Sequence, residues 1–183
     1  MKMNKSGAIE LSIGTIVIVV LAMSMLILGL VLVKSIFSGA TAIADMTNDQ
    51  LKNKMATMFG EDKKVVLYPD SRQIELTQGK VDGFGIGIKN LLEGSSNTVK
   101  FEYDVYLADK GNCDVNEKEA LSWIVTGKTE EDMGIASGDF VSRPVKFNVP
   151  LGSALCTLRY KVEVKANNQN YASDVMDVTI KSK

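Results

Sequence analysis

Few side chains in this sequence have the types and spacing that catalysis or metal binding requires. The chain contains no histidine, which removes the commonest general base, the usual catalytic triad and most zinc sites. Carboxylate pairs such as Glu130 with Glu131 exist, but no pattern around them predicts a pocket. We therefore expect no enzymatic activity, no catalytic or metal-binding residue and no cofactor.

Two other patterns resemble ligand sites but have the wrong spacing. Residues 109–119 are acidic, yet they lack the loop glycine and terminal glutamate of an EF-hand, so we interpret them as a solvated loop. Gly83, Gly85 and Gly87 match neither the P-loop nor the dinucleotide fingerprint. Their alternation with apolar residues predicts a strand with one bare face, on which another part of the chain packs closely.

The two cysteines, Cys113 and Cys156, both lie in the C-terminal part of the chain. If that part is in an oxidising compartment, the two thiols can form a disulfide. Two separately buried thiols are the alternative.

One acid, Glu10, stands where an apolar run begins, between Ile9 and Leu11. Taking a carboxylate out of water costs several kcal/mol unless a cation partners it. Glu10 therefore either stays at the level of the lipid headgroups, where the helix dipole favours an anion, or is paired inside an assembly.

The run that follows Glu10 is long enough to cross a membrane. Residues 11–33 are 23 consecutive residues without a charge, and a spanning helix needs roughly 20. The apolar core of a cleaved secretory signal is shorter, roughly 7–15 residues. Lys2 and Lys5 precede the run and Lys34 follows it, which favours a cytoplasmic N-terminus. We predict a transmembrane helix with the lipid bilayer as its first partner.

The helical pattern continues beyond the apolar run, because no proline precedes Pro69. We predict one stalk helix over residues 8–59, whose second half is amphipathic and packs on an exposed domain. Its apolar positions are Ile36, Ala40, Ile43, Leu51, Met55, Met58 and Phe59. A simple membrane anchor followed by a stalk is the alternative.

The N-terminal segment reads MKMNKSG-AIELSIGTIVIVVLAM: a short basic leader, a small residue, a glutamate and an unbroken apolar helix. It resembles the class III signal peptide of archaeal type IV pilins and archaellins. The resemblance covers Lys5 to Met23 and implies that a prepilin peptidase removes the leader on the cytoplasmic side. Cleavage between Gly7 and Ala8 removes residues 1–7 and makes Glu10 the third mature residue. Cleavage between Lys5 and Ser6 removes residues 1–5 and makes it the fifth, as in bacterial-type pilins.

The resemblance also implies how such a chain assembles. Apolar helices from many copies would bury one another in a helical homopolymer, driven by an assembly ATPase and a membrane platform. Glycines in the helix would allow either close helix approach or local melting. The candidate assembly residues are Glu10, Ile13, Gly14, Ile16, Val20, Met23 and Leu26. The precursor would lie in the cytoplasmic membrane and the product on the cell surface.

Residues 60–183 show the alternation of half-buried strands, which predicts an α+β fold: the long helix followed by an antiparallel immunoglobulin-like β-sandwich headpiece. The expected strands are 65–68, 74–77, 84–88, 99–107, 145–149, 158–164 and 175–180. A capping box at Asp114-Val115-Asn116-Glu117 predicts a short helix through about Val125. It would bury Leu121, Trp123 or Ile124.

The composition of the chain argues against some classes of binding partner. The formal net charge is -1 and no basic, aromatic-interleaved stretch occurs, which argues against a nucleic-acid partner. The N-glycosylation motif occurs at Asn4-Lys5-Ser6, in the leader, and we predict no such modification of the headpiece. We expect a structural pilin of an adhesive filament. The alternatives are an archaellin of a motility filament and a monomeric, single-pass surface binding protein.

Overall fold

The computed structural model describes residues 5–38, 43–92 and 99–183, and it divides into two units, Met1–Gly39 and Ala40–Lys183. The first unit is helix α1, which runs from Lys5 to Ser38 over 34 residues. It forms because its sequence has no proline and is rich in residues that a helix accommodates once lipid or protein surrounds it. Within it, Gly14–Leu32 has a mean hydropathy of 2.9, and its length and composition suit a membrane span.

The prediction of one helix over residues 8–59 is wrong in its second half. A short 3-10 turn, η1 (Ile43–Asp45), and a separate helix, α2 (Asn48–Ala56), follow α1 in the described chain. Thr47 has an extended backbone and begins α2 with a capping box: its Oγ1 accepts from Gln50 N at 3.3 Å, and Gln50 Oε1 accepts from Thr47 N at 3.0 Å. The sequence Thr-Asn-Asp-Gln carries this N-cap signal. The prediction missed it because it relied on apolar periodicity alone.

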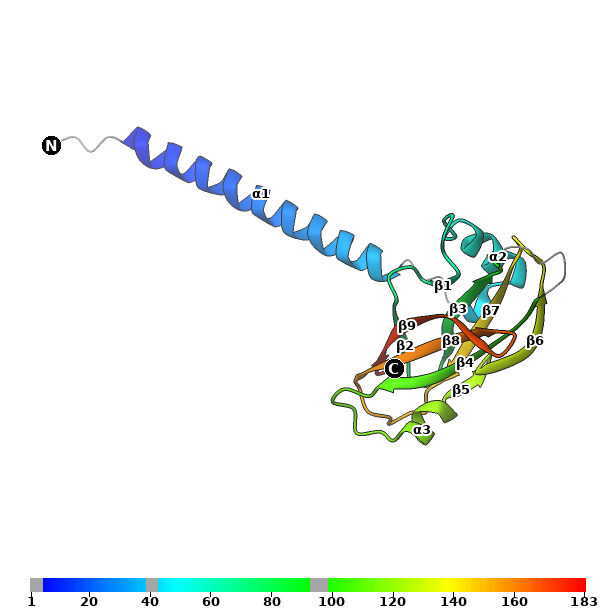
Figure 1. The fold of residues 1–183 in the computed structure, drawn as a ribbon. Helices are drawn as coiled ribbons and strands as arrows, with labels where there is room; N and C mark the ends of the chain where they lie inside the picture. The colour runs from blue at the N-terminus through cyan, green and yellow to red at the C-terminus, as the bar shows by residue number, and fades with distance from the viewer. Residues whose placement is uncertain (1–4, 39–42, 93–98) are drawn as a thin grey trace. The chain divides into compact units, whose positions relative to one another are not determined.

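The second unit, the headpiece, is a sandwich of two sheets (Figure 1). The first sheet is antiparallel and has the order β1 (Val65–Tyr68), β3 (Val81–Lys89), β7 (Phe140–Asn148), β5 (Ile124–Thr126). The second has the order β2 (Gln73–Thr77), β9 (Gln169–Lys181), β8 (Thr157–Ala166), β4 (Val99–Asp109), β6 (Thr129–Ile135). All seven predicted strands are present.

The core lies between the two sheets and follows the alternation read from the sequence. Along β4, the buried residues are Val99, Phe101, Tyr103 and Val105, while residues between them face outward. Phe147 of β7 packs edge-on against Tyr160 of β8, with ring centroids 5.1 Å apart. The aromatic contacts join the two sheets into one core.

The second sheet is mixed, so the prediction of an entirely antiparallel sandwich is wrong. β2 pairs parallel with β9, in the register Gln73 with Asp177. Parallel neighbours need a long connection between them. Here the chain forms strands of the first sheet between β2 and β9, and this connection is long enough for β9 to run parallel to β2. The immunoglobulin-like topology stays a prediction.

Two strands and one helix boundary were not predicted correctly. β6 was missed because its outward residues are acidic, although Met133 and Ile135 are buried. The helix near Asp114 is α3 (Glu117–Ser122), whose N-cap is Asn116; the Asn116 side chain accepts from Glu119 N at 2.8 Å. It buries Ala120 and ends before Trp123, which is also buried, and the next residues form the short strand β5.

The bare glycine face on β3 is confirmed, and α2 is the segment that packs on it. A Cβ on Gly85 would lie 2.7 Å from Leu51 Cδ1, and one on Gly87 would lie 3.1 Å from Met55 Sδ. Leu51 and Met55 are buried there with Ile43, Val66 and Tyr68, forming a second, smaller core. The amphipathic residues therefore pack on the headpiece as predicted, from a separate short helix.

Gly83 lies on β3 against the backbone of β7, so we predict that Gly83→Ala destabilises the headpiece by about 2–3 kcal/mol. A Cβ there would overlap the carbonyl oxygen of Val145, which is backbone and cannot rotate away. The measurement is chemical unfolding of the full chain in detergent. Gly60→Ala is the matched control, because a Cβ on Gly60 has no atom within 4 Å. Equal stability of the two variants would contradict this account of the close approach.

Candidate functional site

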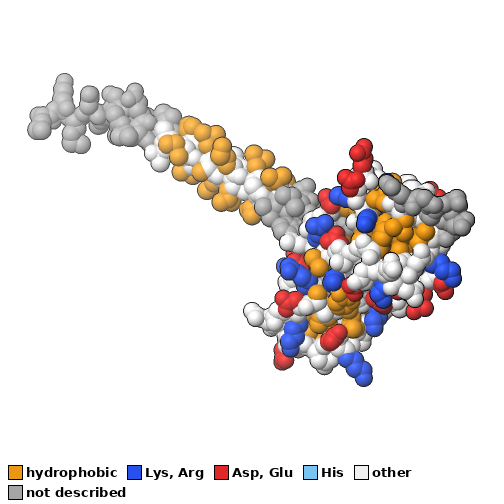
Figure 2. All heavy atoms as spheres, in the orientation of Figure 1, with side chains coloured by type: hydrophobic (Ala, Val, Ile, Leu, Met, Phe, Trp, Pro, Cys, Tyr) orange, Lys and Arg blue, Asp and Glu red, His pale blue; other side chains and the backbone are white. Residues whose placement is uncertain are grey.

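The most unusual surface of the described chain is that of α1. Every residue from Gly14 to Leu32 is exposed, and the large apolar side chains between Ile16 and Leu32 are 45–75% exposed. Figure 2 shows this part of the helix as hydrophobic, with no charged side chain on the visible face. Exposing so much apolar surface to water is unfavourable, because each Å² of it costs about 25 cal/mol of free energy. The helix therefore requires an apolar environment.

This apolar environment must surround the helix. Ile16, Val20 and Met23 share one face through their i, i+4, i+7 spacing, whereas Gly14 lies on the opposite face. The structure therefore does not single out one face among the predicted assembly residues. Leu26 is exposed like these residues. Glu10 and Ile13 lie within α1, and their side chains fall outside the described residues.

The polar and small residues of the apolar span fit such an environment. Ser24 donates its hydroxyl hydrogen to the Val20 carbonyl at 2.8 Å, so its polar group is satisfied within the helix. Gly14 and Gly29 have open space where a Cβ would stand. The helix backbone is accessible at these two glycines, and another helix could approach it closely there.

Both candidate leader bonds lie in the first turns of α1, which begins at Lys5. These are the bonds between Lys5 and Ser6 and between Gly7 and Ala8. The first four N–H groups of a helix have no partner within it, so the first turn opens at low cost. A peptidase would therefore need to unwind only the beginning of α1 to reach either bond.

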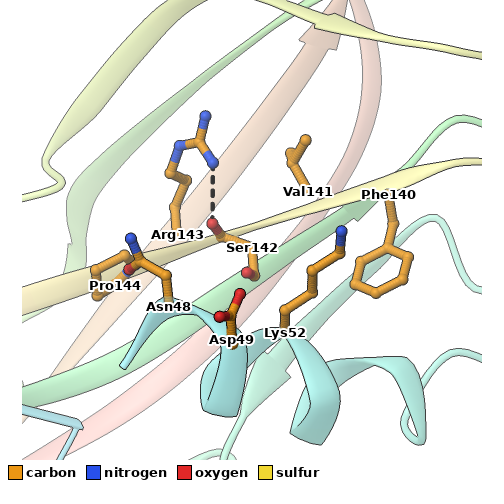
Figure 3. Close-up of a pocket in the computed structure, with 8 residues that line it drawn as sticks. All are labelled: Asn48, Asp49, Lys52, Phe140, Val141, Ser142, Arg143 and Pro144. Atoms are coloured by element: carbon orange, nitrogen blue, oxygen red, sulfur yellow. Dashed lines mark hydrogen bonds between the residues drawn. The ribbon is translucent and has the colours of Figure 1, made fainter. Parts of the chain in front are cut away.

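An open hollow lies between α2 and β7, with a volume of about 420 Å³ (Figure 3). Its two cations are already engaged. Arg143 donates to both carboxylate oxygens of Glu130, at 2.6 and 2.8 Å, and to the Ser142 carbonyl at 3.0 Å. Lys52 Nζ lies 5.7 Å from the centre of the Phe140 ring. The other polar side chains that line this hollow are those of Asn48, Asp49 and Ser142.

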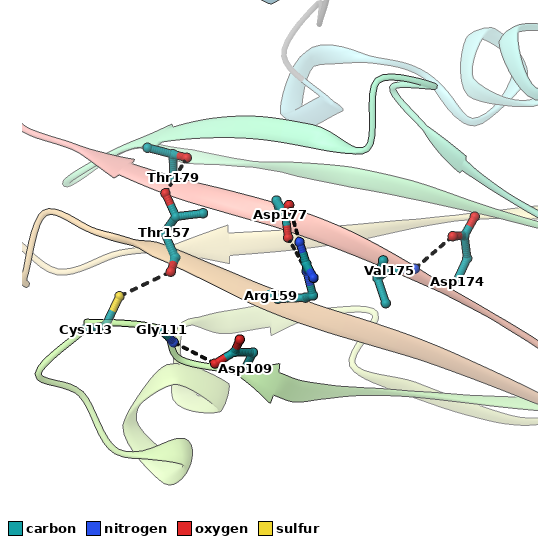
Figure 4. Close-up of polar contacts among 9 residues, drawn as sticks. All are labelled: Asp109, Gly111, Cys113, Thr157, Arg159, Asp174, Val175, Asp177 and Thr179. Atoms are coloured by element: carbon teal, nitrogen blue, oxygen red, sulfur yellow. Dashed lines mark hydrogen bonds and ion pairs between the residues drawn. The ribbon is translucent and has the colours of Figure 1, made fainter.

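The outer face of the second sheet carries paired charges. Arg159 on β8 forms a bidentate ion pair with Asp177 on β9, with distances of 2.7 and 2.9 Å (Figure 4). The Arg159 guanidinium holds the pKa of Asp177 below its ordinary value, mainly by hydrogen bonding. Further pairs on strands of the same sheet are Lys165 with Glu102, Lys161 with Glu163, and Lys181 with Glu75. Charges that neutralise one another in this way suit a face turned to solvent.

Two buried tyrosines also have shifted pKa values, and they are structural. Burial, with the nearby Glu130 carboxylate, raises the pKa of Tyr103 to about 12. Burial also raises the pKa of Tyr160, whose hydroxyl donates to the Ala120 carbonyl at 3.0 Å. Both stay protonated at neutral pH. Among the described residues, no group of three or more acids or cysteines is placed to hold a metal ion.

The structure joins Cys113 and Cys156 in a disulfide, with the two Cα atoms 5.5 Å apart. Cys113 lies between β4 and α3, and Cys156 directly precedes β8. The bond ties two long loops of the headpiece together. Of the two alternatives that the sequence left open, the paired cysteines are the one present.

No protein-family model matches this chain, and no curated protein matches it in sequence. Its headpiece shows distant likeness to solved structures. The first, a family 123 glycoside hydrolase from Clostridium perfringens, has a TM-score of 0.41 at 8% identity. The likeness covers 64% of this chain and 26% of that one, so the chain spans about a quarter of the hydrolase.

A Niemann-Pick type C2 protein from the Japanese carpenter ant has a TM-score of 0.40 at 8% identity, over 65% of this chain and 90% of the other. MyfA, the major subunit of Myf fimbriae from Yersinia enterocolitica, has a TM-score of 0.34 at 12% identity, over 64% and 98%. Scores this low identify neither a shared fold nor a shared function.

Proposed function

We propose that this chain is a structural subunit of an extracellular archaeal type IV pilus-like filament. In this proposal, α1 first holds the precursor in the cytoplasmic membrane. A prepilin peptidase then removes the leader, and the assembly ATPase and membrane platform add the subunit to a helical homopolymer. The single observation that carries the proposal is the uniformly apolar surface of α1 from Gly14 to Leu32. Lipid would cover that surface before assembly, and the identical helices of other copies would cover it in the filament.

The headpiece supports this proposal because its described core closes without α1. Both buried clusters consist of residues from Ile43 onward, and the bare face of β3 is covered by α2. The apolar surface of α1 is therefore not a missing piece of the headpiece core. The described headpiece core therefore does not need α1 to be complete.

Three of the four edge strands in the described sheets, β1, β5 and β6, also favour α1 as the polymerising element, because strand addition is disfavoured at them. The outer strands of the first sheet, β1 and β5, have only four and three residues. In the second sheet, β6 carries Glu130, Glu131 and Asp132, and Asp132 has a positive φ of 56°. Short, charged and distorted edge strands resist pairing with another chain.

The intact mass of the native chain tests leader removal. We expect the mature protein to lack seven residues and begin at Ala8, or to lack five and begin at Ser6. The control is the same chain expressed with Gly7→Trp, because a bulky residue directly before Ala8 should block cleavage between residues 7 and 8. Retention of the whole leader in the native chain would contradict the proposal and favour a single-pass anchored surface protein.

The role of the filament is proposed as adhesion or surface attachment. The helix start resembles archaellins as well as pilins, so a motility filament is the second candidate. Swimming and surface-attachment assays on a deletion strain distinguish them. Loss of attachment with normal swimming supports the adhesive role, and loss of swimming supports the archaellin.

A further inference from the structure

The exposed large apolar side chains of the described headpiece are few and gather at one end of the sandwich. They are Val81, Val125, Leu151 and Leu155, which we call the apolar rim. Val81 begins β3 and pairs with Asn148 at the end of β7. Leu151 follows directly and contacts the Gly79 position, where a Cβ would lie 3.1 Å from Leu151 Cδ2. β5, which carries Val125, pairs with the same end of β7.

Leu151 and Leu155 lie in a loop that hydrogen bonds and the disulfide hold in place. The buried Gln78 donates to the Ser153 carbonyl at 2.6 Å and accepts from Gly152 N at 3.3 Å. Gly79 N donates to the Val149 carbonyl at 2.8 Å, and the disulfide fixes the loop at Cys156. Leu151 and Leu155 are nevertheless 66% and 61% exposed. The contacts that hold this loop therefore leave both leucines exposed.

The same end of the headpiece receives the chain from α1. Ile43 N in η1 donates to Asp82 Oδ1 at 2.8 Å, next to Val81, and Lys146 Nζ donates to the Ala44 carbonyl at 3.4 Å. Only residues 39–42 separate α1 from η1. The five Cα–Cα steps from Ser38 to Ile43 span at most about 18 Å. Copies joined through their α1 helices therefore keep this end of each headpiece close to the helices.

We infer that the apolar rim packs on α1 of a neighbouring copy in the filament, an inference that rests on the proposed function. Four side chains are too few for a free-standing interface, which needs roughly 1,000 Å². They suffice once α1 packing has brought the copies together, because the second contact is then effectively intramolecular. In the described chain, the other large apolar surface is α1, whereas the outer face of the second sheet is ionic.

Photo-cross-linking in sheared filaments tests the contact. With benzoylphenylalanine at position 155, we expect a dimer band whose cross-linked peptide comes from α1 of a second copy. The control is the same label at Lys161, on the ion-paired outer face of β8, which should give no cross-link to α1. Monomer alone, a lipid adduct, or a cross-link confined to headpiece residues from the Leu155 label would overturn the inference.

Introducing charge into the apolar rim gives a second, independent measurement. We expect the double variant Leu151→Asp, Leu155→Asp to lower filament yield at least tenfold, with an unchanged melting temperature of the detergent-solubilised chain. The double variant Leu151→Met, Leu155→Met should keep the native yield. If native chains form filaments and the aspartate variant forms as many, the rim inference fails and the proposed function stands. If native chains form none, the proposed function itself fails.

Discussion

Replacing Met23 with aspartate should lower filament yield by about a hundredfold or more while leaving the headpiece folded. Met23 is 62% exposed near the centre of the apolar span. An acid at the centre of a membrane helix costs about 2.5–3.5 kcal/mol, which corresponds to roughly a hundredfold in an equilibrium. The rest of the span is apolar enough to insert despite this cost. In a filament, however, every copy would bury an unpaired carboxylate.

The measurement compares membrane-fraction protein with sheared filament protein from the same cells. Met23→Leu is the matched control, because it keeps an apolar side chain of similar volume and should assemble normally. The aspartate chain should appear in the membrane fraction and be absent from the sheared fraction. Native filament yield from the aspartate variant would show that α1 is not buried among its copies.

Removing the disulfide should lower the free energy of unfolding of the headpiece by about 4 kcal/mol. Cys113 and Cys156 are 43 residues apart in sequence, and closing a loop of that length restricts the unfolded chain by roughly this amount. The bond also fixes the loop that carries Leu155. The double variant Cys113→Ala, Cys156→Ala should therefore unfold at a markedly lower denaturant concentration.

Fluorescence of Trp123, the single tryptophan, reports this unfolding, because its side chain is buried next to α3. A reducing agent should lower the stability of the native chain to that of the double variant. The variant itself should not respond to the reducing agent. A difference below about 1 kcal/mol between native and variant chains would mean that the bond contributes little.

Much of the headpiece could be predicted because its strands alternate clearly. In β4 and β8, apolar residues face the core at every second position, and the strands occur where expected. β5 and β6 escaped because their burial depends on partners distant in sequence: β5 has three residues, and β6 exposes acids between Met133 and Ile135. The parallel pairing of β2 with β9 is likewise set by the path of the whole chain.

The helical part shows where local patterns mislead. Apolar residues at helical spacing joined α1 and α2 in the prediction, because spacing alone cannot show that Thr47 begins a new helix. The glycines of β3, in contrast, correctly predicted a close neighbour, and the structure identifies it as α2. The apolar rim was not predicted, because exposure of single leucines in a loop depends on how Gln78 and the disulfide hold that loop.

Electron cryo-microscopy of filaments sheared from native cells tests most directly whether α1, after leaving the lipid, is buried among the α1 helices of other copies. We predict filaments of this chain in which the α1 helices form a closely packed central bundle and the sandwiches lie outside it. The N-terminal residue in the density should be Ala8 or Ser6. Surface material without filaments of this chain, or filaments held by headpiece contacts with α1 excluded from the centre, would contradict the account.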